Sequence, residues 1–152
     1  MDHFAAHIDS STALVITSHA YFRSGALQDL SALRDISARQ GAYLLVDGYQ
    51  AIGSVPFSVA EVDPDFVVGG CHKWLCGGPG AGFLYVRPQT LEKLQPRLTG
   101  WFGLADPFSY DPGPTGQQLH PSVRRFMHGT PNIPGLFAAQ AGLQGVLNTG
   151  VA

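Results

Sequence analysis

The hydrophobic positions of the chain fall into two patterns. Short uninterrupted apolar runs are typical of buried strands, and apolar residues repeated every three or four positions are typical of helices. Between the first two apolar runs, residues from Leu27 to Ile36 recur at helical spacing, and Gly41 is expected to end that helix. The predicted strands are 13–17, 43–46, 66–68 and 82–86.

Farther along the chain the pattern is less regular. A short helix is predicted at 90–94, just after Pro88, and an alanine- and leucine-rich closing helix at 134–147. The segment 98–121 is rich in glycine, proline and aromatic residues, which predicts an irregular loop. Strands and helices that alternate with short connectors predict an α/β fold, with a mostly parallel sheet flanked by helices. Such sheets place their sites at the carboxyl ends of the strands.

Composition narrows the class of protein. A chain of 152 residues is expected to form a single domain around one core. With 45% hydrophobic residues, 13% charged residues and a net charge of −2, the chain is expected to be a soluble globular protein. It lacks a basic stretch for nucleic acid and an apolar run long enough to span a membrane. The first residues do not resemble a secretory signal, so a cytoplasmic location is the default expectation.

Lys73 is one of two lysines and stands in the nearly uncharged segment 67–80. A lysine in an apolar, tightly turned segment loses solvation of its ammonium form, which favours the neutral amine as a nucleophile toward a carbonyl carbon. The alternative is a lysine that extends to the surface beside a glycine turn, since lysines are mostly exposed.

Asp47 follows directly after the predicted strand 43–46. Its carboxylate could cap the next turn, or it could reach a ligand bound at the edge of the sheet. Lys73, which comes after one further strand, favours the second interpretation. A pyridoxal phosphate site needs a lysine for the Schiff base and an acid that keeps the pyridine nitrogen protonated.

Two other kinds of site are not supported by this region. Cys71 and Cys76 are expected to be free thiols, and His72 is the only further zinc-type donor in that stretch, so no metal site is predicted. The glycine cluster 77–82 precedes a strand, whereas a dinucleotide-binding fingerprint opens a helix, and it lacks the Gly-Lys-Ser/Thr ending of a P-loop. These glycines are therefore expected to form a tight turn.

Three segments together resemble the cofactor core of the class V aminotransferase family, which are fold type I pyridoxal phosphate enzymes. They are 47–51 (DGYQA), 62–66 (VDPDF) and 71–80 (CHKWLCGGPG). Within that family, 22–29 and 100–103 are most similar to kynureninase. The similarity covers nearly the whole chain. Because enzymes of this family are much longer, the chain is expected to be a fragment of the large domain, with its cofactor core at 43–86.

The resemblance implies a role for each matching position around pyridoxal 5'-phosphate. Lys73 is the Schiff-base lysine, and Asp47 is the partner of the pyridine nitrogen. Gln50 lies near the phenolic oxygen of the ring, and His72 binds the phosphate. Gln50 and His72 are more similar to the aminotransferase and cysteine desulfurase members than to kynureninase.

Two later positions imply a second subunit. Trp101 and Thr130 correspond to positions that reach the phosphate of a cofactor bound mainly by the other subunit, which implies a homodimer with shared sites. Trp101 favours kynureninase. Without the resemblance, Trp101 is also explained as a core or interface aromatic, and Thr130 as a turn residue before Pro131.

Two hypotheses about function remain open. The chain belongs to a pyridoxal phosphate-dependent enzyme that acts on an amino acid, by transamination or by kynureninase-like cleavage of a bond to the β-carbon. Alternatively, it is a truncated, non-catalytic homologue that keeps the fold core and acts as an interaction module. A desulfurase is not supported, since neither Cys71 nor Cys76 matches the catalytic cysteine of those enzymes.

Overall fold

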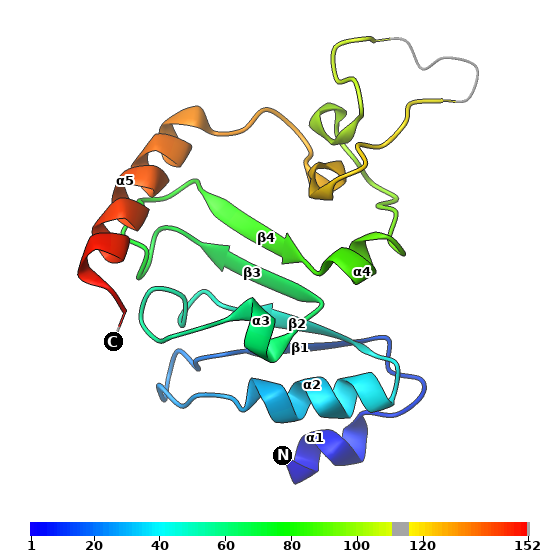
Figure 1. The fold of residues 1–152 in the computed structure, drawn as a ribbon, viewed down its shortest axis with the longest axis vertical. Coiled ribbons are helices and arrows are strands. Elements are labelled where there is room, and N and C mark those ends of the chain that lie inside the picture. The colour runs from blue at the N-terminus through cyan, green and yellow to red at the C-terminus, as the bar shows by residue number, and fades with distance from the viewer. Residues whose placement is uncertain (111–115, 152) are drawn as a thin grey trace. The chain divides into compact units, whose positions relative to one another are not determined.

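The computed structural model describes residues 1–110 and 116–151, which form two compact units (Figure 1). The first unit comprises Met1–Arg87 with Asn132–Ala152, and the second comprises Pro88–Pro131. The expected single-domain organisation stays a prediction. Part of the predicted irregular loop 98–121, namely 111–115, lies outside the described residues.

The first unit is built on a four-stranded sheet in the order β1-β2-β3-β4 (Figure 1). The strands are β1 (Leu14–Ser18), β2 (Tyr43–Asp47), β3 (Phe66–Gly70) and β4 (Gly82–Val86). All four predicted strands are therefore confirmed, with ends that differ by at most two residues. β1, β2 and β3 are parallel, whereas β4 is antiparallel to β3. No helix crosses the sheet between β3 and β4, so the chain returns antiparallel, and the predicted mostly parallel α/β fold is confirmed.

The main helices begin and end at recognisable capping residues. In α2, the carboxylate of Asp29 accepts the Ala32 N–H, and the helix is followed by Gly41 at φ 74°. This cap starts the helix later than the apolar spacing predicted, and Leu27 instead forms an isolated bridge with Ala20. The helices are α1 (Asp2–His7), α2 (Leu30–Arg39), α3 (Val59–Val62), α4 (Pro88–Leu91) and α5 (Ile133–Thr149), with 3-10 turns η1 (Trp101–Gly103) and η2 (Val123–Phe126).

The main core lies between α2 and one face of the sheet, which we call the covered face. Leu33 of α2 and Leu44 and Val46 of β2 are each 0% exposed. Burial of each such side chain contributes roughly 1.5–3 kcal/mol to folding. The other buried members of this core are Ile8, Val15, Leu30, Ile36, Ala42 and Val67.

The opposite face of the sheet is also apolar, but it is largely exposed. The register of the strands aligns Leu14 and Ile16 of β1 with alternate residues of the neighbouring strands, and Ile16 is 64% exposed. Parallel sheets usually bury both faces, so a bare apolar face is unusual. We call this surface the open face; by register it comprises Leu14, Ile16, Ser18, Tyr43, Leu45, Asp47, Phe66, Val68, Gly70, Gly82, Leu84 and Val86.

Two arginines form ion pairs that link elements of the covered face. Arg34 of α2 and Arg87, which follows β4, both pair with Asp63 and with Asp65, at distances of 2.7–3.3 Å. Asp65 is 1% exposed and also accepts the backbone N–H of Leu44. One buried carboxylate therefore joins α2, β2 and the end of β4.

Candidate functional site

The predicted site residues gather where two neighbouring parallel strands end. Asp47 is the last residue of β2, and the segment with His72 and Lys73 follows β3 directly. The backbone N–H of Gly48 donates to the Val68 carbonyl at 2.8 Å, which fixes the start of the loop after β2 against β3. The structure thus brings these residues to one edge of the sheet, as the sequence predicts.

The Asp47 carboxylate is half-buried and held on both oxygens. Oδ1 accepts the backbone N–H of Tyr49 at 2.9 Å, and Oδ2 accepts the hydroxyl of Ser18 at 3.3 Å. The contact with Tyr49 is the turn cap that the sequence left open as one interpretation. A carboxylate has about four lone-pair positions, so a capped Asp47 can still accept a bond from a ligand.

Lys73 extends over an aromatic ring beside Asp47. Its Nζ lies 5.5 Å from the centre of the Tyr49 ring, and the His72 ring lies 5.7 Å from the same ring. The Lys73 side chain is exposed, so the described residues do not withdraw the ammonium from water. The surface position, left open as the alternative, is the one observed.

Tyr49 was not predicted as a site residue, yet it contacts both ends of the site. Its ring lies over Gly70, the last residue of β3, where any Cβ would collide with the ring. Its backbone N–H donates to Asp47, and its ring faces Lys73. Only its place two residues after Asp47 could have drawn attention to it.

Gln50 joins the two loops of the site. Its Oε1 accepts the indole N–H of Trp74 at 3.3 Å. The amide N–H groups of Gln50 remain able to donate to a ligand. This bond and the Tyr49 contacts hold the loop after β2 beside the loop after β3.

The remaining predicted residues, Trp101 and Thr130, belong to the second unit. Trp101 packs edge-on against Phe102 and Phe108, with ring centres 4.6 and 5.4 Å away, and Thr130 is exposed. The aromatic residues of this loop therefore pack on one another. The roles of Trp101 and Thr130 at a phosphate stay predictions.

Helix α5 supports the lysine loop from behind. A Cβ on Gly142 would collide with the backbone of Leu75 and Cys76, and one on Gly77 would lie 2.6 Å from the Ala139 Cα. The loop is also closed on itself, since the Cys76 N–H donates to the Lys73 carbonyl at 3.0 Å. The glycines thus allow helix and loop backbones to touch.

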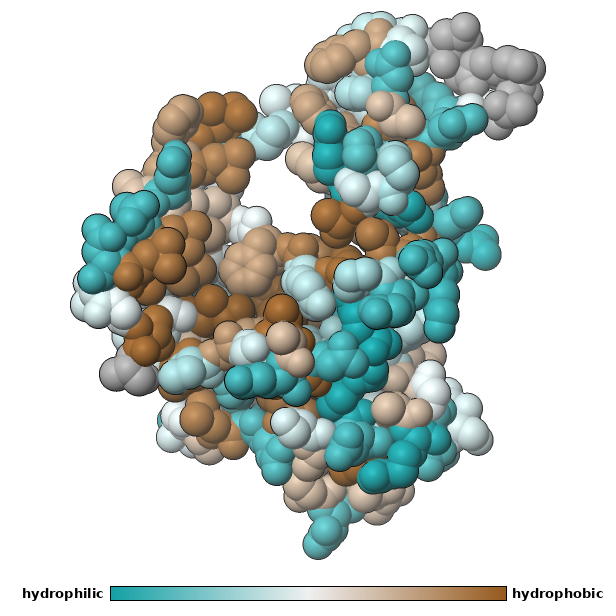
Figure 2. Space-filling model, in the orientation of Figure 1, coloured by the Kyte–Doolittle hydropathy of each residue, from teal (hydrophilic) through white to brown (hydrophobic). Residues whose placement is uncertain are grey.

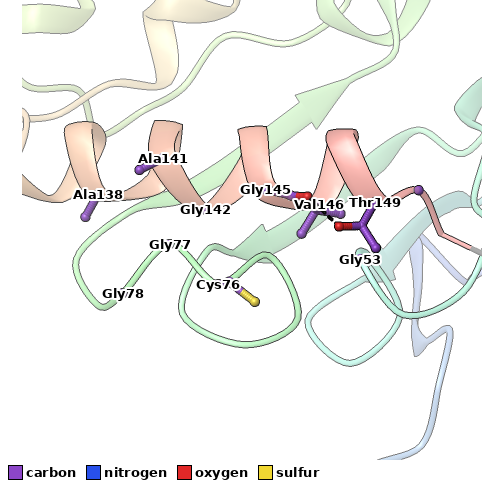
Figure 3. A pocket seen from close by; sticks show the side chains of 11 residues that line it. Gly53, Cys76, Gly77, Gly78, Ala138, Ala141, Gly142, Gly145, Val146 and Thr149 are labelled. Atoms are coloured by element: carbon purple, nitrogen blue, oxygen red, sulfur yellow. Dashed lines mark hydrogen bonds between the residues drawn. The ribbon is translucent and has the colours of Figure 1, made fainter.

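Beside this contact lies a groove of about 790 Å³, lined mainly by small residues (Figure 3). None of the predicted site residues lines it, so the groove is separate from the Asp47–Lys73 edge. The lining residues are Gly53, Cys76, Gly77, Gly78, Ala138, Ala141, Gly142, Gly145, Val146, Thr149 and Gly150.

Residues 1–110 and 116–151 contain neither a metal-binding cluster nor a membrane-spanning helix. No three His, Cys, Asp or Glu side chains there are grouped so that they could hold a metal ion. No helix in that part of the chain has the length and apolar character needed to cross a membrane. Cys71 is a buried free thiol and Cys76 an exposed one.

Comparison with known proteins gives consistent matches. The chain is 35% identical, over all 152 residues, to the uncharacterized aminotransferase YcbU of Bacillus subtilis, and covers 39% of that protein. It is 32% identical over 148 residues to the kynureninase of Pseudomonas fluorescens, and this match covers 95% of this chain and 34% of that protein. A solved structure of C-DES with glycine covalently linked to its PLP cofactor matches with a TM-score of 0.82 and 28% identity, over 97% of this chain and 38% of that one.

The chain therefore spans little more than a third of the length of these relatives. Its match to a family model is nevertheless complete: the model described as aminotransferase class-V covers residues 1–152. That match includes the strands, both loops of the site and α5, and it confirms the resemblance seen in the sequence. The chain belongs to the class-V aminotransferase family.

Proposed function

We propose that this chain is the cofactor-binding part of an enzyme that acts on an amino acid, with Lys73 as its Schiff-base lysine. The cofactor of such an enzyme is pyridoxal phosphate, as in the C-DES structure. The reaction is transamination or kynureninase-like cleavage of a bond to the β-carbon. One observation carries the proposal: Asp47 and Lys73 both contact Tyr49 at the carboxyl ends of adjacent parallel strands.

The residues at this edge have the chemistry that the cofactor requires. Lys73 supplies the amine, and Asp47 supplies a fixed, half-buried carboxylate for the ring N–H. The amide of Gln50 can donate to the phenolic oxygen, and the ring of His72 can donate to the phosphate. The four side chains together therefore fit pyridoxal phosphate.

When bound, pyridoxal phosphate supplies a ring that accepts electrons from the substrate carbon. Asp47 holds the proton on the ring nitrogen, which an anionic carboxylate favours electrostatically. Nζ of Lys73 would hold the cofactor and would take a proton from the substrate carbon as a general base. Asp47 thus acts by charge, and Lys73 acts by attachment and proton transfer.

In this proposal, Trp101 and Thr130 act in trans. They complete the phosphate site of a second subunit, so the parent enzyme is a homodimer with shared sites. Support comes from the positions that they occupy in the family pattern.

The test uses the fact that the chain has only two lysines, Lys73 and Lys93. The purified chain is mixed with pyridoxal phosphate, reduced with borohydride, digested and analysed by peptide mass spectrometry. The pyridoxyl mass is expected on Lys73, together with a visible absorption band before reduction. A Lys73→Ala variant is expected to lose both, whereas a Lys93→Ala variant keeps both. Equal labelling of Lys93, or an unchanged band in Lys73→Ala, contradicts the site.

The alternative function, a non-catalytic interaction module, is favoured by a different observation. Apolar side chains gather along α5 (Figure 2), where Phe137 is 69% and Leu147 is 74% exposed. The open face of the sheet adds Ile16 at 64%. Exposed apolar surfaces of this kind mark contact sites with other chains. This alternative is adopted if the wild-type chain takes up no pyridoxal phosphate at all.

A further inference from the structure

Tyr49 contacts both the acid and the amine of the site. Its backbone is tied to Asp47 by the 2.9 Å hydrogen bond, and its ring centre lies 5.5 Å from Nζ of Lys73. No role was assigned to this residue from the sequence, and the proposed function does not use its side chain. Its contacts nevertheless span the whole site.

Two glycines of the sheet lie near the Tyr49 ring. Gly70 leaves the space that the ring fills, because a Cβ there would collide with it. A Cβ on Gly82, the register partner of Gly70 on β4, would lie 3.8 Å from the Tyr49 hydroxyl. The ring therefore requires the absence of a side chain at Gly70, whereas a Cβ at Gly82 would only touch the hydroxyl.

The ring face is also the partner that the structure gives to the Lys73 ammonium. An aromatic face attracts a cation within about 6 Å of its centre. Among residues 1–110 and 116–151, every ion pair is formed by Arg34 or Arg87, and none involves Lys73. The lysine side chain is long and exposed, so without the ring it would sample many rotamers.

We propose that Tyr49 is a positioning residue, whose ring rather than its hydroxyl holds the Lys73 amine at the Asp47 side of the site. The ring thereby holds Nζ in its cationic form, which must lose a proton and leave the ring face before it can capture an aldehyde cofactor. The part concerning capture rests on the proposed function. The contact between ring and amine does not, and it can be measured without any cofactor.

The first experiment observes the contact directly. The full chain is reductively methylated with ¹³C-formaldehyde, which labels Lys73, Lys93 and the terminal amine and keeps each of them cationic. In the NMR spectrum, the Lys73 methyl signal is expected upfield of the Lys93 signal because of the ring current, with an NOE to the Tyr49 ring protons.

Three variants separate the ring from its hydroxyl and from the sheet. Tyr49→Phe is expected to keep the upfield shift, and Tyr49→Leu is expected to bring the Lys73 signal to the position of the Lys93 signal. Tyr43→Leu, at the amino end of β2 on the open face, is expected to leave the shift unchanged. An absent NOE in the wild type overturns the inference, even if Tyr49→Leu does not fold. The inference is also overturned if the Lys73 signal keeps its upfield position in the spectrum of Tyr49→Leu.

The second experiment measures capture. The rate at which borohydride-trapped pyridoxyl accumulates on Lys73 is expected to rise about two- to five-fold in Tyr49→Leu, because loss of a weak cation–π contact releases the amine, and to stay unchanged in Tyr49→Phe. An equal rise in both variants assigns the effect to the hydroxyl and overturns the proposal. If instead Lys73→Ala still captures cofactor, the proposed function fails, while the NMR result still decides the role of Tyr49.

Discussion

The two faces of one sheet differ in what they do. On the covered face, Leu44 and Val46 are 0% exposed beneath α2, whereas on the open face Ile16 is 64% exposed. At the end of β1, consecutive residues point to opposite faces of the sheet. The hydroxyl of Ser18 donates to Asp47 on the open face, while the ring of His19 stacks on Phe57, which packs against the covered core.

This contrast shows how the fold separates stability from chemistry. The covered face contains the close packing and the buried ion pairs, so substitutions there act mainly on folding. The open face carries Asp47, and the site forms where that face meets the carboxyl ends of the strands. Residues of the site are thus free of the packing demands that fix the core, and the following predictions test this separation.

The largest effect is expected for Asp65→Asn. This change leaves Arg34 and Arg87 without their buried partner, and loss of one member of a buried ion pair costs about 3–5 kcal/mol. Asp63→Asn is the matched control, since that carboxylate is 55% exposed and should cost less than about 1 kcal/mol. Urea denaturation followed by circular dichroism measures both. Similar losses in the two variants would show that burial of Asp65 does not matter.

A smaller difference is expected between two leucines on opposite faces. Leu44→Ala removes a side chain that is 0% exposed on the covered face and should lower the free energy of unfolding by about 2–5 kcal/mol. Leu14→Ala removes the same atoms from the open face, where the side chain is 40% exposed, and should cost about 1 kcal/mol or less. Equal midpoints in urea would mean that the open face is packed in solution.

The smallest effect concerns pH and His19. Burial lowers the pKa of His19 below its usual 6.5, so the folded state binds fewer protons at this ring than the unfolded state. Its contribution to stability is therefore present above pH 6.5 and is lost as the pH falls below that value. In His19→Gln, the fall in the urea midpoint between pH 7 and pH 5 should be shallower than in the wild type. Parallel profiles would assign that fall to other groups.

Much of the fold was accessible from the sequence because its signals are local. Each strand is an uninterrupted apolar run, and Gly41 and Pro88 mark element ends within a few residues. The start of α2 was misplaced because the cap at Asp29 overrides the apolar spacing that includes Leu27. The sequence did not predict that β4 runs antiparallel to β3. The turn-rich connection between the two strands indicates a short link, but it does not by itself specify the direction of the next strand.

The site was accessible only in part, because its remaining features depend on distant contacts. Asp47 and Lys73 follow apolar runs, so their strand-end positions could be inferred. The role of Tyr49 depends on the absence of a side chain at Gly70, on another strand. The sequence left the exposure of Lys73 open, because it does not show that apolar neighbours such as Leu75 turn toward the interior while Lys73 stays exposed.

The backbone contact of Gly142 with Cys76 has a consequence for biosynthesis. The ribosome releases Lys73 early, but α5, which braces its loop, emerges only after the entire second unit has been made. A nascent chain therefore carries Lys73 on an unsupported turn until α5 has been made. That turn should become rigid abruptly, when α5 folds back onto it.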